Sequence, residues 1–200
     1  MTDGPGLYLI SPPLVDVADF LPRLNAALDA VEVACIRLDM ATTDEAAIKR
    51  AADQARETAH AHDVAITLTN HYRIAKAIGL DGVHLANPRL TVREAREHLG
   101  KDAIVGAYAG ASRHDGMVAA EAGADYVSFG PVAANELGDG EIADLSLFEW
   151  WAQMIETPVV AEGGLTAERA APLAAHVDFV APDPGVWSSA ADLKPFAELG

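Results

Sequence analysis

The feature of this sequence that most constrains its fold is the regular alternation of short apolar runs with longer, alanine-rich stretches. The short runs are rich in Val, Ile and aromatic residues, as buried strands are, and the longer stretches have helical periodicity. The runs predict strands at residues 7–10, 34–38, 65–68, 82–85, 104–107, 126–129, 159–161 and 177–181. The stretches between and after them predict helices at residues 17–30, 43–61, 72–78, 92–99, 115–122, 145–155, 167–174 and 188–199.

Eight strand–helix units predict a closed (β/α)8 TIM barrel made by one domain, residues 1–200. Such barrels usually take about 250 residues and have a lower limit near about 200, so this chain predicts a minimal barrel with short connections. An open, doubly wound sheet is the alternative. It is disfavoured because Ser11, Pro12 and Pro13 follow the first strand, where that fold carries a glycine-rich dinucleotide motif.

Turn and cap residues agree with this order of elements. Gly79, Gly100 and Gly123 follow predicted helices, where a left-handed residue ends the helix. Residues of the N-cap type precede three predicted helices, at Thr43, Thr91 and Thr166. The longest stretch without a predicted element, residues 131–144, follows the sixth strand and is expected on the catalytic face of the barrel.

Composition excludes several classes of function. Fourteen basic against thirty acidic residues give a formal charge of −16, which opposes binding to nucleic acid or to an acidic membrane surface. The single cysteine, Cys35, excludes a disulfide framework and a multi-cysteine metal site. Residues 1–6 contain no basic segment ahead of an apolar run, so we expect a soluble cytoplasmic protein that is not exported.

Four segments, in order along nearly the whole chain, resemble signatures of the thiamine-phosphate synthase and thiazole tautomerase barrels. They are LYLI at 7–10, DGVHL at 81–85, GADYVSFGPV at 123–132 and PVVAEGGLT at 158–166. The resemblance implies a transferase of thiamine biosynthesis that joins a pyrimidine, activated as a pyrophosphate ester, to a thiazole phosphate. It also implies Mg²⁺ on the leaving pyrophosphate, with carboxylates to hold the metal and cationic or backbone donors to hold phosphate.

The chain departs from the family pattern where the resemblance places metal and pyrophosphate. Residues 36–40 (IRLDM) replace the family's Gln-Leu-Arg-Glu-Lys, Asn70 and His71 fall in the place of its Asn-Asp-Arg, and Arg89 replaces a metal-binding Asp. Residues 133–138 contain no Thr-x-Thr-Lys, and residues 182–185 (PDPG) replace a Val-Ser phosphate contact. Both expected magnesium carboxylates are therefore missing. No metal ligand is predicted, and Mg²⁺ remains only an implication of the resemblance.

Charges near the expected phosphate site also oppose an anion. Gly163 and Gly164 keep backbone donors available, but Glu162 and Asp183 place carboxylates beside that position, and the neighbouring prolines supply no N–H. Two like charges about 4 Å apart repel by roughly 1 kcal/mol in water and about four times that at a partly buried site. We expect the Glu162 and Asp183 carboxylates to lie at the carboxyl-terminal mouth of the barrel.

His84 and Glu162 are the candidate catalytic residues. His84 lies inside a predicted strand, where a base or ligand competes with a hydrogen-bonded core histidine. Glu162 lies between Ala161 and a Gly-Gly turn, where a carboxylate is costly unless it is paired, hydrogen-bonded or metal-bound.

Ten residues are candidates for substrate binding, and each has a structural alternative. Asp39 either faces a ligand or pairs with Arg37, two residues back on the same strand face. Asn70 and His71 either bind substrate or serve the loop, and Ser112 either binds an anion or caps a helix. The full set is Arg37, Asp39, Asn70, His71, Arg89, Ser112, His114, Gly163, Gly164 and Asp183.

Three functions stay open at this point: an active synthase or tautomerase with a rewired site, a divergent enzyme acting on an unphosphorylated substrate, or a non-catalytic barrel that binds a thiamine-related ligand. The acidic residues Glu136, Asp139 and Glu141 lack the ligand spacing of a calcium loop.

The apolar positions of residues 145–155 cover more of a helix circumference than one inward stripe requires. Core packing at the edges of the helix explains part of this breadth. The rest predicts a homo-oligomer that uses Trp150 or Trp151.

Overall fold

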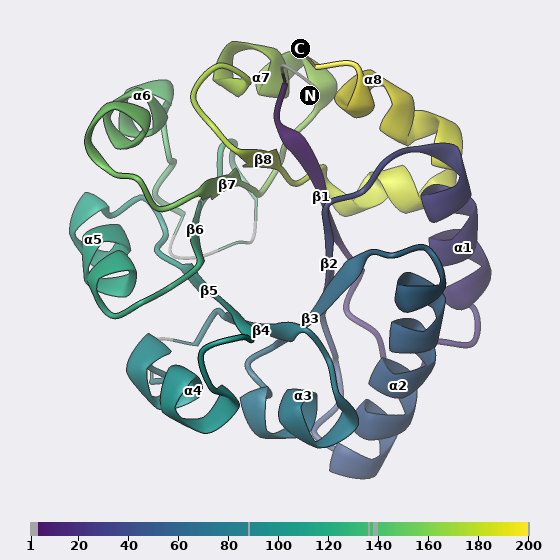
Figure 1. Ribbon diagram of the computed structural model, residues 1–200. Coiled ribbons are helices and arrows are strands. Elements are labelled where there is room, and N and C mark those ends of the chain that lie inside the picture. The colour runs from purple at the N-terminus through teal and green to yellow at the C-terminus, as the bar shows by residue number, and fades with distance from the viewer. Residues whose placement is uncertain (1–3, 88, 136, 138–139, 200) are drawn as a thin grey trace.

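The computed structural model describes residues 4–87, 89–135, 137 and 140–199, and these form a closed parallel barrel with strand order β1 to β8 (Figure 1). Helices surround the barrel on its outside, as the sequence predicts for a TIM barrel. The strands are β1 Gly6–Ile10, β2 Cys35–Leu38, β3 Ala65–Thr69, β4 Gly82–Leu85, β5 Ile104–Tyr108, β6 Tyr126–Phe129, β7 Val159–Ala161 and β8 Phe179–Val180.

The first six helices follow the predicted stretches closely. They are α1 Leu21–Ala30, α2 Glu45–Ala61, α3 Tyr72–Ile78, α4 Val92–Leu99, α5 Arg113–Glu121 and α6 Leu145–Met154. Thr91 caps α4 in a capping box with Glu94, and Thr166 caps α7. The prediction that Thr43 caps α2 is wrong, because the Asp44 side chain accepts the amide of Ala46 instead.

The last quarter of the chain is less helical than predicted. α7 Ala167–Ala170 continues as a 3-10 turn, η1 Ala171–Leu173, because Pro172 supplies no amide to an α-helical ladder. The single helix predicted at 188–199 is wrong. Two 3-10 segments, η2 Pro184–Ser188 and η3 Ala190–Leu193, precede a short α8 Lys194–Ala197, and Ser189 between them is extended with φ −154°.

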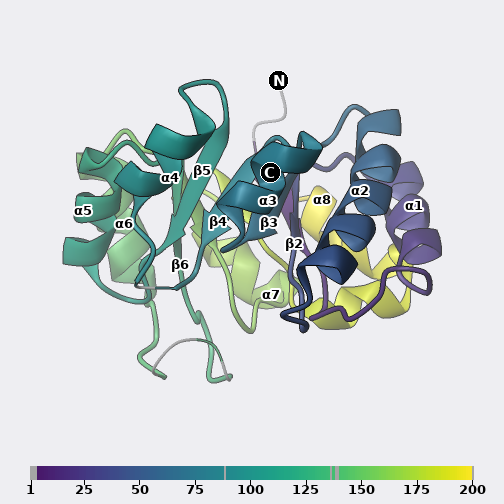
Figure 2. The ribbon, with the colours of Figure 1, turned by 90° about the horizontal axis from the view of Figure 1, so that it is seen from below.

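Two apolar regions hold the barrel together. The larger lies between the strands and the surrounding helices, and the smaller fills the barrel interior with Tyr8, Cys35, Tyr126, Val160 and Ala181. Cys35 is buried there, as expected for a small core residue. The described residues of the connection between β6 and α6 project beyond one end of the barrel (Figure 2).

The two tryptophans of α6 have different environments. Trp151 is 1% exposed, packs edge-on against Phe129 at 4.9 Å between ring centroids, and donates its indole N–H to the carbonyl of Thr157. The expectation that Trp151 lies at an interface is therefore wrong, because this part of the wide apolar surface of α6 packs into the core. Trp150 is half-buried beneath the guanidinium of Arg113, 4.7 Å from the ring centroid.

Candidate functional site

A buried ion pair crosses the mouth of the barrel. Arg37 projects from β2, and Glu162 follows β7 directly; both are almost completely buried. The two guanidinium NH groups face the two carboxylate oxygens, Nη1 to Oε1 at 3.2 Å and Nη2 to Oε2 at 3.0 Å. This bidentate geometry supplies the partner that a carboxylate at this position requires.

Asp39 adds a second carboxylate to Arg37. Its Oδ1 lies 3.3 Å from Arg37 Nε, as the pairing interpretation predicts, and the same oxygen accepts the hydroxyl of Thr69 at the end of β3. The amide of Asp39 donates to Ser11 Oγ after β1. With both carboxylates ionised, the cluster of Arg37, Asp39 and Glu162 carries one net negative charge.

A chain of hydrogen bonds lies below the ion pair inside the barrel. His84 Nδ1 is 3.0 Å from the hydroxyl of Tyr126, which is 2.6 Å from the hydroxyl of Tyr8. Burial and the nearby Arg37 charge hold the pKa of His84 well below its usual value, so the ring is neutral. Burial also raises the pKa of Tyr126. The expectation of a hydrogen-bonded core histidine agrees with this geometry, and whether His84 has a catalytic role stays a prediction.

Asn70 has a structural task in the loop after β3. It adopts φ 65°, a left-handed conformation that Asn tolerates better than most residues. Its Oδ1 accepts the amides of Ala86 and Asn87, which ties the loop after β3 to the loop after β4. His71 beside it is half-buried, and burial lowers the pKa of its ring. Arg89 is exposed.

The remaining predicted site residues lie around the mouth without joining the ion pair. Ser112 caps α5 by accepting the amide of Asp115, and His114 is exposed. Gly163 and Gly164 have φ 82° and 72°, and a Cβ on either would come close to Pro131 or Ala133. Asp183 follows β8 but is exposed, and its carboxylate accepts the amide of Gly185. Glu162 and Asp183 thus share the predicted end of the barrel but not one pocket.

Sequence reasoning missed Tyr8, Ser128 and Thr69. Side chains alternate between the two faces of a strand, and this alternation indicates that all three point into the barrel interior, as Arg37 does. It also missed Trp187 of η2, whose indole N–H donates to the carbonyl of Ile10 at the end of β1. Of the acidic loop, Glu136 and Asp139 lie outside the described residues.

The residues at the mouth do not fit the Mg²⁺ that the resemblance implies. Both oxygens of Glu162 face Arg37, and Asp39 Oδ1 is shared by Arg37 and Thr69. The amide oxygen of Asn70 is held by two backbone donors. Within the described residues, no three His, Cys, Asp or Glu side chains come together as a metal site would need.

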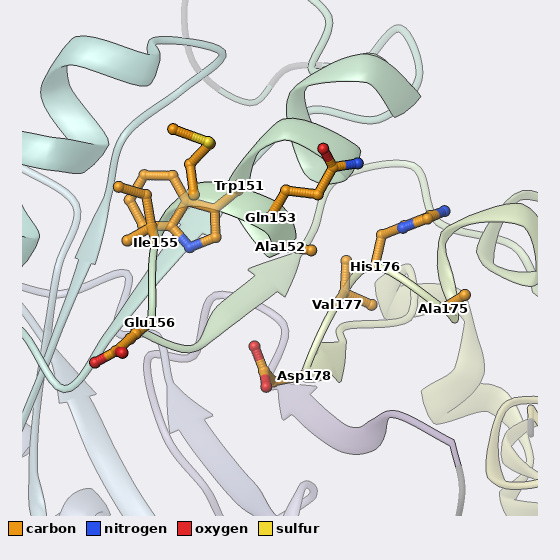
Figure 3. Close-up of a pocket in the computed structure, with 10 residues that line it drawn as sticks. Trp151, Ala152, Gln153, Ile155, Glu156, Ala175, His176, Val177 and Asp178 are labelled. Atoms are coloured by element: carbon orange, nitrogen blue, oxygen red, sulfur yellow. The ribbon is translucent and has the colours of Figure 1, made fainter.

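A large surface hollow lies away from this site. It measures about 550 Å³ and is lined by the end of α6 and by the segment leading into β8 (Figure 3). This places it at the amino-terminal rim of the strands, whereas TIM-barrel enzymes react at the opposite rim. Asp178 in this hollow accepts the amide of Val159 and so has a structural task.

No helix among the described residues is long and apolar enough to cross a membrane.

Comparison with known proteins identifies the chain's relatives. Residues 7–182 match the family model described as thiamine monophosphate synthase. A thiamine-phosphate synthase of Rhodospirillum centenum is 45% identical over 186 residues, covering 91% of this chain and 89% of the relative. One from Erythrobacter litoralis is 41% identical over 201 residues, covering 96% and 93%. A solved thiamine phosphate pyrophosphorylase from Pyrococcus furiosus has a TM-score of 0.82 at 21% identity, over 96% of this chain and 95% of that one, which shows a shared fold.

Proposed function

The chain belongs to the thiamine monophosphate synthase family, and we propose that it joins a pyrimidine pyrophosphate to a thiazole phosphate at the mouth of its barrel. The observation that carries this proposal is Arg37, a buried cation at the carboxyl-terminal mouth of the barrel in a chain that matches the family from residue 7 to 182. A guanidinium offers two parallel donors and matches the geometry of phosphate oxygens.

The other residues of the mouth position that cation. Glu162 and Asp39 fix the Arg37 side chain from two sides, so a substrate phosphate would have to exchange with the Glu162 carboxylate. Gly163 and Gly164 let the backbone after β7 pack closely against Pro131 and Ala133, where a Cβ would be crowded. Since the donor set does not fit Mg²⁺, no step is assigned to a metal.

One observation favours a second candidate. The charge of Arg37 is already matched by two carboxylates, so the cluster has no excess positive charge with which to stabilise a leaving pyrophosphate. The same barrel would then bind an unphosphorylated, thiamine-related ligand, either as a divergent enzyme or as a binding protein.

Complementation separates the two. We expect this chain to restore growth of a thiamine-requiring strain that lacks its own synthase, and Arg37→Ala to abolish growth while the protein still accumulates in soluble form. Arg50→Ala, at an exposed position of α2, is the matched control and should grow. Failure of the wild-type chain to support growth, with soluble protein present, would reject the synthase proposal in favour of the second candidate.

Calorimetry with pyrophosphate tests the role of the metal. Because neither Asn70 nor Arg89 supplies a charged oxygen to a hard cation, Mg²⁺ should not tighten pyrophosphate binding. Micromolar, magnesium-dependent binding would contradict this expectation.

A further inference from the structure

Three aspartates at the amino-terminal rim of the barrel occupy equivalent places. Asp81, Asp125 and Asp178 directly precede β4, β6 and β8. Through Oδ2, each accepts a backbone amide from the strand before it, at 2.7–2.8 Å. The amide–carboxylate pairs are Ile66–Asp81, Val105–Asp125 and Val159–Asp178. A helix precedes the first strand of each pair, so the three places can be compared contact by contact.

At two of the three places, that helix also brings a basic side chain to the aspartate. His60, in the last turn of α2, lies with Nε2 2.9 Å from Asp81 Oδ2. Arg96, in the last turn of α4, places Nη2 2.5 Å from Asp125 Oδ2. The third helix, α6, has no basic residue in its last turn, and among the described residues Asp178 has no cationic partner.

Arg96 shows what a guanidinium contacts at such a place. Besides the carboxylate, its Nη2 donates to the carbonyl of Gly123 at 2.9 Å, and its Nη1 donates to the carbonyl of Ala103 at 2.5 Å. Gly123 lies two residues before Asp125, and Ala103 lies two residues before Val105. One planar cation therefore joins a carboxylate to two backbone carbonyls, which uses the parallel donors that a guanidinium provides.

The third place has the same acceptors but only part of the donor set. Two residues before Val159 and Asp178 lie Thr157 and His176, whose carbonyls correspond to the two that Arg96 contacts. The indole N–H of Trp151, from the last turn of α6, donates to the Thr157 carbonyl at 2.8 Å. In the part of the chain that the structure describes, no side chain donates to the His176 carbonyl. The Asp178 carboxylate and this carbonyl are therefore available to a ligand.

Both groups lie in the surface hollow of about 550 Å³ at the end of α6 (Figure 3). This volume falls within the range of small-molecule pockets, about 300–1,000 Å³. The lining contains the carboxylates of Glu156 and Asp178 and, among the described residues, neither Lys nor Arg. His176 is the one basic side chain of the lining, and its Nε2 lies 3.9 Å from a carboxylate oxygen of Glu149. The carboxyl-terminal end of α6 adds the negative end of a helix dipole, so charge in the hollow favours a cation.

We propose that this hollow binds a small guanidinium compound, which bridges the Asp178 carboxylate and the His176 carbonyl as Arg96 bridges the equivalent pair. A guanidinium fits better than an ammonium group, because its planar N–H groups reach both acceptors at once. The hollow has room for more than this one group, so the ligand is a free compound with a guanidinium at one end. The site lies at the opposite rim from the mouth of the barrel, and the inference is independent of the proposed function.

Nuclear magnetic resonance of the indole N–H groups tests the site. The Trp151 signal reports on the hollow, and the Trp187 signal is an internal control, because that indole bonds to Ile10 at the other end of β1. Each is assigned by its loss in Trp151→Phe or Trp187→Phe. The probes are methylguanidinium, its uncharged analogue methylurea, and methylammonium, at constant ionic strength and below denaturing concentrations. We expect methylguanidinium to shift the Trp151 signal saturably, methylammonium to do so more weakly, and methylurea to leave it unchanged.

Two results would overturn the proposal at this stage. An equal response to methylurea would show that charge does not determine binding, and the absence of a saturable response to methylguanidinium would show that no such site exists. N-acetylargininamide presents the same group as a peptide side chain. If it binds more tightly than methylguanidinium, the ligand is an arginine of a partner chain rather than a free compound.

Charge removal at the aspartate is the direct test of its role. Asp178→Asn keeps the shape of the side chain and an oxygen that can accept a hydrogen bond, and it should weaken methylguanidinium binding several-fold. Glu168→Gln, at an exposed position of α7, is the matched control and should bind as wild type does. Unchanged binding by Asp178→Asn would overturn the proposal.

A second variant leaves the contact between Asp178 and the Val159 amide in place, so that a loss of folding in the first does not decide the outcome. Gln153 of α6 lines the hollow six residues before Val159, the same spacing that separates His60 from its strand partner. Gln153→Arg therefore supplies the missing guanidinium from the chain itself. It should abolish the methylguanidinium response and raise the Tm, and full binding by this variant would contradict the assigned site.

Discussion

At the scale of single residues, the Arg37–Glu162 pair makes the sharpest energetic demand on the fold. Removing one member of a buried pair leaves the other charge uncompensated, which typically costs about 3–5 kcal/mol. Asp39 remains as a partner for Arg37, so Glu162→Ala should lower the free energy of unfolding by about 3 kcal/mol, near the lower end of that range. Urea denaturation measures this loss of stability. Glu32→Ala, at an exposed position, is the control and should stay within about 0.5 kcal/mol of wild type.

Replacing both members should cost less than the two single changes suggest. Arg37→Met with Glu162→Met removes two buried charges at once and refills their volume with apolar groups. We expect a coupling energy of about 2 kcal/mol in the double-mutant cycle. Additive losses would show that the two side chains do not depend on each other, in conflict with the bidentate contact.

His84 gives the barrel a pH dependence with a defined sign. Its pKa is well below 6.5 in the folded protein and returns to about 6.5 on unfolding. Below about pH 6.5, the unfolded chain therefore binds a proton at His84 and the folded chain does not. The stability associated with neutral His84 is therefore complete above about pH 7.5 and falls as pH drops through 6.5, by up to about 1.4 kcal/mol per pH unit. Urea titrations at several pH values should show this slope, and His84→Gln should lack it.

Only part of this site could be predicted from the sequence. Glu162 was conspicuous because a carboxylate beside a Gly-Gly turn needs a partner, and the two-residue spacing of Arg37 and Asp39 pointed to their contact. The partnership of Arg37 with Glu162 spans 125 positions and depends on barrel closure, which no local pattern encodes. Ser128 was overlooked because a lone serine in a strand resembles any other.

At the scale of elements, three aspartates at the amino-terminal rim of the barrel make the same pair of hydrogen bonds to a neighbouring strand. Asp81, Asp125 and Asp178 each directly precede an even-numbered strand. Each carboxylate accepts a backbone amide from the odd-numbered strand before it, at 2.7–2.8 Å. The backbone amide of each aspartate donates to the carbonyl of that same residue. The contact therefore fixes the register of three strand pairs.

Loss of one such contact should loosen one strand pair. A hydrogen bond to a charged group contributes about 1.5–3 kcal/mol, so Asp178→Ala should lower the unfolding free energy by about 2 kcal/mol and speed hydrogen exchange at the Val159 amide. Glu156→Ala is a matched control, since that carboxylate lines the same hollow (Figure 3). Equal effects of the two changes would argue against the contact.

Element boundaries show where local signals succeed and fail. Residues 72–78 and 92–99 were predicted to the residue, because Gly79 follows the first helix and Thr91 caps the second. The last strand and helix were predicted too long. Pro195 lies inside the predicted helix 188–199 and supplies no amide to its ladder, and the extended backbone at Ser189 separates η2 from η3.

At the scale of the whole molecule, the eightfold alternation was enough to predict the barrel, because parallel strands with crossover helices have few ways to bury both faces. Closure itself then creates the site. Residues on or next to β2, β4, β6 and β7 are far apart in sequence and meet only in the barrel interior. The fold can therefore be predicted from the sequence, but most contacts of the site cannot.

Self-association is the remaining whole-molecule prediction. With Trp151 buried, Trp150 is the surface indole of α6, and Arg113 lies over it; Trp and Arg are the residue types that dominate interface energetics. The formal charge of −16 makes two copies repel, and salt screens that repulsion. We therefore expect light scattering to show a homo-oligomer that strengthens as ionic strength rises, and Trp150→Ala to dissociate it without unfolding the barrel. Glu149→Gln, next to Trp150 on the same helix, should instead leave the assembly intact or tighten it, because it removes one like charge from each copy. A monomer at every salt concentration would reject an assembly through α6.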